Sequence, residues 1–198
     1  MNKYLKVSLT LATIASGSAL LIGLMNLATV NPIKTNKENK IKDGISALCP
    51  GYHLQSQITF VDTKEGEKYY KPEYDGNKYP HLKNAYRLTL PQWQVTFSTP
   101  EKEKTKYVYS TTGKNAYGQV DLLVLVAGGE VEKLLVVTNT ESYGPTLEDN
   151  YINKYNNGYL TDLADVKCGA TYGAKTVKEQ CDDALAHWTA FYADKEGI

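Results

Sequence analysis

The feature that most constrains this fold is a pair of strongly apolar runs separated by two glycines. The runs are QVDLLVLVA at 119–127 and VEKLLVVTN at 131–139, and Gly128, Gly129 and Glu130 lie between them. Both runs are short and rich in leucine and valine, and paired glycines favour the tight turns of β-hairpins. We therefore expect an antiparallel hairpin at the centre of a sheet.

Weaker strand signals precede this hairpin, and a helical signal follows it. Alternating runs between about residues 55 and 112 read QITFVD, YRLTL, QWQVTFST and KYVYSTT, with turn-rich pieces such as EYDGNKYP between them. A long connection after the hairpin holds a short helical piece near residues 147–155. The last helix shows one apolar face at helical spacing. The sequence predicts an α+β fold with one antiparallel sheet and packed helices, and the members of the helical face are Val177, Cys181, Leu185, Trp188 and Tyr192.

The N-terminal segment carries no charged residue between Lys6 and Lys34. It exceeds the roughly 20 apolar residues that a helix needs to cross a hydrocarbon core of about 30 Å. A cleaved signal peptide would end soon after its small-rich stretch at 15–19, but the apolar residues continue through 20–24. We expect an uncleaved transmembrane helix at residues 1–33, and a cleaved signal or a buried core helix are the alternatives.

The charged and polar residues indicate how the rest of the chain is organised. A polar segment at 34–51 predicts a stalk helix that ends at Pro50 and Gly51, and residues 52–198 form the expected domain. Lysines lie on both sides of the apolar segment, so charge alone does not fix a membrane topology. The 22 basic and 22 acidic residues cancel, which gives no long-range field for nucleic acid.

The three cysteines, Cys49, Cys168 and Cys181, form no CxxC motif and have no histidine at metal-ligand spacing. A structural zinc site is therefore not expected. Buried thiols are the favoured interpretation, and a disulfide between Cys168 and Cys181 is the alternative. The three histidines also lack partners at motif spacing and are interpreted as structural or surface residues.

Three sequence motifs surround the hairpin. Tyr117 and Gly118 precede the first run, the loop after the second run reads ESYG at 141–144, and DVKCGAT occupies 165–171. In these motifs the chain resembles the FMN-binding domain family of Rnf electron transport complexes and of the sodium-pumping NADH:quinone reductase. That family shows a hairpin, an ETPG-type loop and a D-x-x-[ST]-G-A-T motif that opens a helix. The resemblance extends from about residue 117 to residue 188.

The resemblance implies that FMN is bound covalently to Thr171 as a phosphoester, added by a dedicated flavin transferase that uses FAD. Glycine and alanine before this threonine allow close approach of a phosphate, and the following helix presents free N–H groups to it. Cys168 stands where the family has serine or threonine, and Gly173 stands where many members have a second hydroxyl. The implied cofactor-binding set is Thr171, Ala170, Gly169, Cys168, Glu141, Ser142, Gly144 and Asp165.

An ordinary structural role for Thr171 is the alternative, as the residue where a helix begins. Thr176 competes for that role, because Glu179 follows it at the spacing of a capping box. These residues alone do not decide between the two positions.

The function implied by the resemblance is electron transfer, with the flavin supplying the chemistry and no catalytic side chain. The protein would be one component of an Rnf- or Nqr-type ion-translocating complex, not an enzyme alone. It would lie in the cell membrane as a single-pass protein with its C-terminal domain extracytoplasmic, and other membrane proteins of the complex and the flavin transferase would be its partners. The alternatives are a free-standing anchored flavoprotein for extracellular electron transfer and a membrane-tethered β-rich binding module without a cofactor.

Overall fold

A computed structural model describes residues 3–61 and 72–193. The chain divides after Lys40 into two compact units. The first unit is the greater part of α1 (Lys3–Leu48), a continuous helix that includes Pro32. The second unit begins at Ile41 and contains the sheet and all the remaining helices of the described residues.

The transmembrane helix predicted at residues 1–33 is wrong. Of the described residues, no helix combines the length and the apolar character that crossing a bilayer requires. The segment is helical, but a run without charge is not necessarily a run without polar groups. Ser16, Ser18, Asn26 and Thr29 all lie within it, and such residues reduce the favourable free energy of transfer into lipid.

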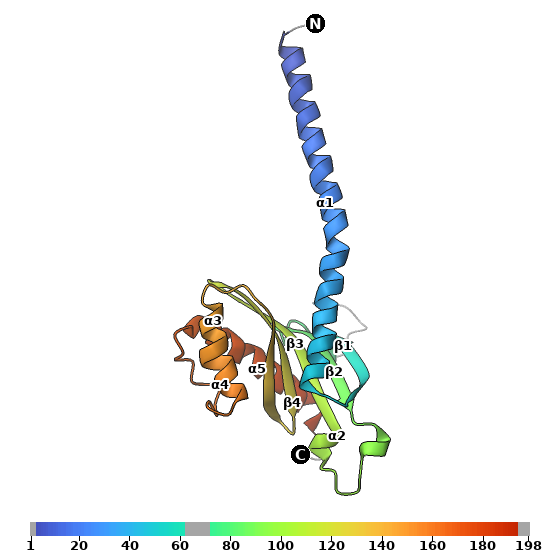
Figure 1. The fold of residues 1–198 in the computed structure, drawn as a ribbon, viewed down its shortest axis with the longest axis vertical. Coiled ribbons are helices and arrows are strands. Elements are labelled where there is room, and N and C mark those ends of the chain that lie inside the picture. Colours follow the sequence, from blue (N-terminus) through green and yellow to red (C-terminus); the bar gives the residue numbers. More distant parts are fainter. Residues whose placement is uncertain (1–2, 62–71, 194–198) are drawn as a thin grey trace. The chain divides into compact units, whose positions relative to one another are not determined.

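The antiparallel sheet of the predicted α+β class is confirmed (Figure 1). Its strands follow one another in sequence order, and each pairs antiparallel with the next. The hairpin turn has positive φ at both Gly128 (58°) and Gly129 (84°), a backbone conformation that glycine adopts without strain. The strands are β1 (His53–Thr59), β2 (Leu82–Thr89), β3 (Thr105–Asn115), β4 (Gly118–Ala127) and β5 (Glu130–Asn139).

Two details of the predicted sheet are wrong. The run QWQVTFST is not a strand, because Pro91 precedes a 3₁₀ turn, η2 (Gln92–Gln94), and its carbonyl accepts the N–H of Gln94 at 2.9 Å. The hairpin is also not central, since β5 is the edge strand. Side chains cover that edge. Oδ1 of Asn156 accepts the N–H of Leu134 at 2.8 Å, and Nδ2 of Asn156 donates to the carbonyl of Leu134 at 2.7 Å. Capping the free backbone groups in this way protects an edge strand from pairing with another chain.

Both faces of β4 are buried, which explains its almost continuous apolar sequence. Alternate residues of β4 enter different cores: Leu122 and Val124 pack on the face covered by α5 (Thr171–Phe191), and Leu123 and Leu125 pack on the other. Ile41 and its neighbours at the end of α1 cover this second face. The sheet is therefore the middle layer of the second unit.

Helix α5 packs on the sheet through the predicted face, with Val177, Cys181, Trp188 and Tyr192 buried and Leu185 half-buried. It begins at Thr171, earlier than the Thr176 start that was considered. Gly113 in β3 allows the close approach, because a Cβ there would lie 2.3 Å from Cγ2 of Thr176.

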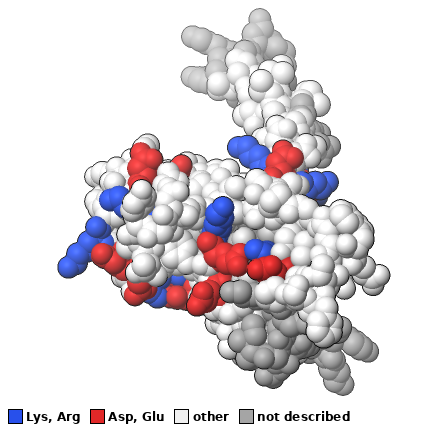
Figure 2. Space-filling view, turned by 60° about the horizontal axis from the view of Figure 1, so that its bottom comes forward, with Lys and Arg blue, Asp and Glu red and all other residues white. Residues whose placement is uncertain are grey.

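Short elements complete the fold. Figure 1 shows α3 and α4 beside one another, and α4 contacts the edge strand β5. Figure 2 shows acidic and basic side chains intermixed on the face that it views, as zero net charge suggests. The short elements are η1 (Pro72–Tyr74), α2 (Glu101–Lys104), α3 (Gly144–Leu147), the π-helical turn η3 (Glu148–Ile152) and α4 (Asn153–Asn156).

Candidate functional site

A pocket of about 230 Å³ lies at the N-terminal end of α5. Its walls come from the turn between β3 and β4, the loop after β5 and the segment that enters α5. We call it the tyrosine pocket, and its lining residues are Tyr117, Glu141, Tyr143, Gly169, Ala170, Thr171, Tyr172 and Gly173. Four of the eight residues predicted from sequence, Glu141, Gly169, Ala170 and Thr171, therefore meet here.

The N-terminal end of α5 is suited to binding an anion. Gly169 has φ +87°, and a Cβ there would lie 3.3 Å from Cγ2 of Thr146, so a side chain at this position would be strained. Ala170 is the N-cap residue, and it provides no side-chain hydrogen bond to the first turn. The first N–H groups of a helix have no partner within the helix, and they form the positive end of its dipole. Thr171 is the first helical residue, and its side chain is exposed at this end.

Glu141 also lines the pocket and is only 7% exposed. Its Oε1 accepts a hydrogen bond from Nδ2 of Asn115 at 2.6 Å, and its backbone N–H donates to Oδ1 of Asn139 at 3.0 Å. Its Oε2 has no hydrogen-bond partner within the described part of the chain. Buried polar atoms in proteins are nearly always paired, so this oxygen indicates a missing partner.

Gly173 makes room for that carboxylate. A Cβ at Gly173 would lie 2.2 Å from Oε2 of Glu141 and 2.8 Å from its Cδ. The carboxylate therefore packs directly against the first turn of α5, where negative charge is favourable and where the helix has no acidic residue of its own.

Three tyrosines form the open rim of the pocket. Tyr117, Tyr143 and Tyr172 are 41%, 53% and 61% exposed. The ring of Tyr117 lies 5.8 Å from that of Tyr143 and 5.4 Å from that of Tyr172, measured between centroids. Exposed aromatic rings at contact distance offer apolar faces and edges to another planar ring.

The other four predicted residues lie outside the pocket lining. Ser142 donates from both its N–H (3.0 Å) and its Oγ (3.3 Å) to the carbonyl of Tyr117, so it supports the rim. Gly144 begins α3, and a Cβ there would lie 2.9 Å from Nδ2 of Asn139. Asp165 accepts the N–H of Lys167 at 3.1 Å in an exposed turn.

Cys168 is half-buried beside the core, and no disulfide joins it to Cys181. All three cysteines lie in the described residues and are free thiols, two of them buried. Burial raises the pKa of the Cys49 thiol to about 11 and also raises that of Cys181. Both thiols are therefore protonated near neutral pH and are poor nucleophiles.

Sequence reasoning missed the rim tyrosines and Gly173 as site residues. Each tyrosine adjoins a motif glycine or threonine: Tyr117 precedes Gly118, Tyr143 precedes Gly144, and Tyr172 follows Thr171. This repeated adjacency is the only signal in the sequence, because tyrosine is abundant throughout the chain.

The chain matches no protein-family model and no curated protein sequence. The resemblance to the FMN-binding domain therefore depends on the short motifs of the sequence alone.

Proposed function

We propose that this protein is an electron-transfer flavoprotein that carries FMN as a phosphoester on Thr171. The observation that carries the proposal is the position of Thr171: an exposed hydroxyl on the first residue of an uncapped helix, at the mouth of a pocket with an aromatic rim.

The attachment point fits a phosphate. The exposed Oγ of Thr171 is accessible to a transferase, and the first-turn N–H groups of α5 would hold the phosphate oxygens. Gly169 leaves the approach open, since its positive φ excludes most side chains. A side-chain N-cap would compete for the same N–H groups, and Ala170 provides none.

The rim of the pocket fits a flavin ring. Tyr117, Tyr143 and Tyr172 would contact the ring, shield part of it from water and leave an edge open to a redox partner. The bound flavin would supply the electron-carrying chemistry, and the protein residues would orient the ring and adjust its reduction potential.

Covalent maturation has a simple balance. The Oγ of Thr171 would form a bond to the phosphorus of the FMN half of FAD, and the pyrophosphate P–O bond would break. AMP would leave, and the hydroxyl proton would pass to solvent through the transferase. The product is the protein with one FMN less one water.

The test is co-production of the full chain with a flavin transferase, followed by in-gel flavin fluorescence after denaturation. The wild-type protein and Thr171→Ser should fluoresce, because both keep a hydroxyl at this position. Thr171→Val should not. Equal fluorescence from the valine variant would exclude Thr171 as the attachment site, and no fluorescence from any variant would contradict the proposed function.

Assembly into an ion-translocating complex stays a prediction from the resemblance. It is tested by co-purification from the source cell: partner proteins that carry flavin or iron–sulfur groups should accompany this chain. Recovery of the flavinylated chain without them would favour a free-standing carrier.

A further inference from the structure

The loop that joins β2 to α2 carries two strongly exposed aromatic side chains, Trp93 (80% exposed) and Phe97 (110% exposed). Their segment, PQWQVTFSTP at 91–100, contains no charged residue and has a proline at each end. We call it the aromatic loop, and Figure 1 shows it in green beside α2, beyond the end of the sheet. Two large apolar side chains close together in an uncharged segment indicate an interaction surface.

Hydrogen bonds within the aromatic loop give it a defined shape. Trp93 lies in the 3₁₀ turn η2. Phe97 lies in a second turn, which is closed by the N–H of Thr99 on the carbonyl of Thr96 at 3.1 Å. Each aromatic side chain is therefore carried by a hydrogen-bonded turn, which lowers the entropy cost of holding it in place for a partner.

The polar side chains of the second turn bond to one another. Oγ1 of Thr96 lies 3.1 Å from Oγ of Ser98 and 3.0 Å from Oγ1 of Thr99. The N–H of Thr96 donates to Oγ1 of Thr99 at 2.9 Å. An unpaired hydroxyl or N–H group costs free energy in apolar surroundings, so this pairing suits the residues around Phe97 to leave water.

Area, hydrogen bonding and charge decide among the possible partners of the aromatic loop. Its two aromatic side chains can bury at most about 500 Å², whereas a stable protein interface buries about 800 Å² on each partner. Protein interfaces also form roughly one hydrogen bond per 100–200 Å², and the hydroxyls of the second turn are already paired. A bilayer surface requires neither the area nor the bonds. Tryptophan and phenylalanine are favourable there, and the absence of charge removes the largest cost of entry.

We infer that the aromatic loop binds the surface of a bilayer of zwitterionic lipid, with Trp93 and Phe97 inserted at the boundary between head groups and acyl chains. Gln92 and Gln94 flank Trp93, are exposed and stay among the head groups. Helix α2, which follows the loop, has the sequence EKEK, whose charges cancel, so the loop has no preference for anionic lipid. A loop bound in this way enters one leaflet and does not cross the bilayer.

The aromatic loop and the tyrosine pocket lie at opposite ends of β3. The loop and α2 precede the first residue of this strand, Thr105, and Tyr117 of the pocket follows its last residue, Asn115. The 11 residues of β3 span roughly 36 Å at about 3.3 Å each. A bilayer bound at the loop therefore leaves the pocket open, and the inference does not depend on what the pocket binds.

The first experiment uses the full chain without flavin and vesicles of phosphatidylcholine. The chain has two tryptophans, and Trp188 is buried in the core, so Trp93 reports contact with lipid. We expect vesicles to shift the emission of Trp93 to shorter wavelength. Phosphatidylcholine with bromine on its acyl chains should lower that emission by about half, because the ring reaches the acyl boundary. Trp93→Phe keeps an aromatic ring and should lose both changes.

The second experiment measures partition of the full chain onto the same vesicles by cosedimentation. Phe97→Ala removes one inserted ring and should weaken partition about tenfold. Tyr159→Ala is the matched control, since Tyr159 is 83% exposed in the connection before α5; it should partition as the wild type does. Both substitutions are at exposed positions and leave the fold intact. Any contribution from another part of the chain is common to both variants and cancels.

The outcomes separate this inference from the proposed function. Unchanged emission of Trp93 with vesicles, or equal partition of Phe97→Ala and Tyr159→Ala, overturns the inference. A shift of the emission that follows protein concentration without lipid gives the loop to a second copy of the chain, and it also overturns the inference. None of these results bears on flavin at Thr171, which the in-gel fluorescence tests independently.

Discussion

The two ends of α5 have different surroundings. At its N-terminal end, the helix borders a pocket with exposed tyrosines and a buried carboxylate oxygen that has no hydrogen-bond partner among the described residues. At its C-terminal end, His187 is fully buried, and its ring lies against those of Phe60, Tyr79 and Tyr109.

The polar groups of His187 are all used. A backbone carbonyl can only accept, so Nε2–H of His187 donates to the carbonyl of Glu73 at 3.0 Å. Nδ1 is then the acceptor of the Tyr109 hydroxyl, also at 3.0 Å. Burial lowers the pKa of His187, which agrees with a neutral ring that has one donor and one acceptor.

The two ends of α5 therefore have different roles. Its C-terminal end contributes stability through packed, fully bonded side chains. Its N-terminal end presents an exposed threonine and exposed tyrosines around a pocket, an arrangement that a ligand can complete. Substitutions at the two ends should therefore separate stability from flavin attachment.

The largest effect is expected at the C-terminal end. His187→Ala removes a buried ring and its hydrogen bonds with the Glu73 carbonyl and the Tyr109 hydroxyl. We expect a loss of about 3–4 kcal/mol in the free energy of unfolding. Urea denaturation measures it, and a loss below about 1 kcal/mol would show that the aromatic surroundings of His187 are not important for stability.

The second effect tests the contact between Gly173 and Glu141. Alanine in a helix is normally more stable than glycine by about 0.5–1 kcal/mol, but here its Cβ would collide with the carboxylate. We expect Gly173→Ala to destabilise the protein by about 1–2 kcal/mol.

A double-mutant cycle provides the control for this contact. In a Glu141→Ala background the collision is absent, so Gly173→Ala should become stabilising by about 0.5–1 kcal/mol. The same sign in both backgrounds would refute the close packing of the carboxylate on α5.

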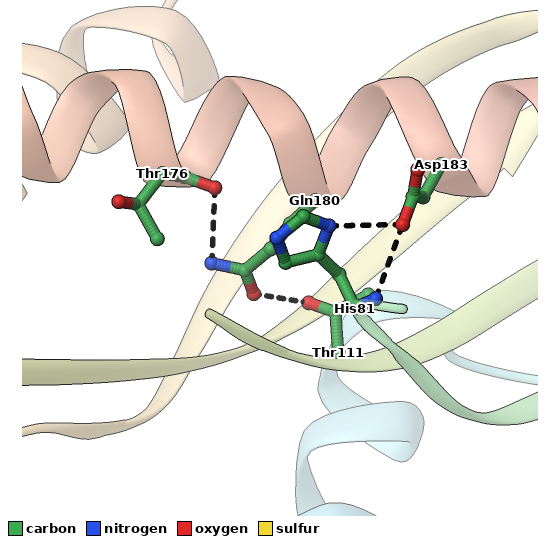
Figure 3. Close-up of polar contacts among 5 residues, drawn as sticks. All are labelled: His81, Thr111, Thr176, Gln180 and Asp183. Atoms are coloured by element: carbon green, nitrogen blue, oxygen red, sulfur yellow. Dashed lines mark hydrogen bonds and ion pairs between the residues drawn. The ribbon is translucent and has the colours of Figure 1, made fainter. Parts of the chain in front are cut away.

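A third, smaller effect depends on pH. His81 binds Asp183 of α5 through its Nδ1 at 2.9 Å and its backbone N–H at 3.1 Å, and the hydrogen bond to Asp183 raises the pKa of His81 above 6.5. The charged pair (Figure 3) therefore contributes its full stability below pH 6.5 and loses it as the pH rises through the raised pKa. His187 has a lowered pKa, so its contribution has the opposite sign and begins to fall below pH 6.5.

The substitution Asp183→Asn removes the contribution of the His81–Asp183 pair and leaves that of His187 in place. It should cost about 0.5–1 kcal/mol at about pH 5.5, because the pair is only partly buried, and clearly less at about pH 9. Thermal denaturation across this range measures the change, with His53→Gln, a change at an exposed histidine, as the control. An equal cost at both pH values would mean that the ion pair does not form.

The smallest effect on stability is expected at Thr171, although its effect on flavin is the largest. Thr171→Val alters an exposed side chain at the open end of α5, and the free energy of unfolding should change by less than about 0.5 kcal/mol. A larger loss in the flavin-free protein would indicate that the hydroxyl has a structural role, such as helix capping.

The sequence predicted the hairpin and the buried face of α5, because each has a strong local pattern, whereas the grouping of Glu141 with Thr171 came from the family resemblance. It did not predict the rim tyrosines, since an exposed tyrosine in a loop gives no signal of its neighbours. Gly173 was noted as a departure from a family pattern, and its reason, the carboxylate of Glu141, depends on tertiary packing. The transmembrane prediction failed because it weighed the absence of charge above the serine, threonine and asparagine residues of the segment.

The most direct test of the central claim is mass spectrometry of one tryptic peptide. Cleavage after Lys167 and Lys175 releases CGATYGAK, in which Thr171 and Tyr172 are the only hydroxyl residues. From protein co-produced with an active flavin transferase, we expect this peptide to gain the mass of FMN less one water, with fragment ions that place it on Thr171. An unmodified peptide, or FMN on any other residue, would contradict the account.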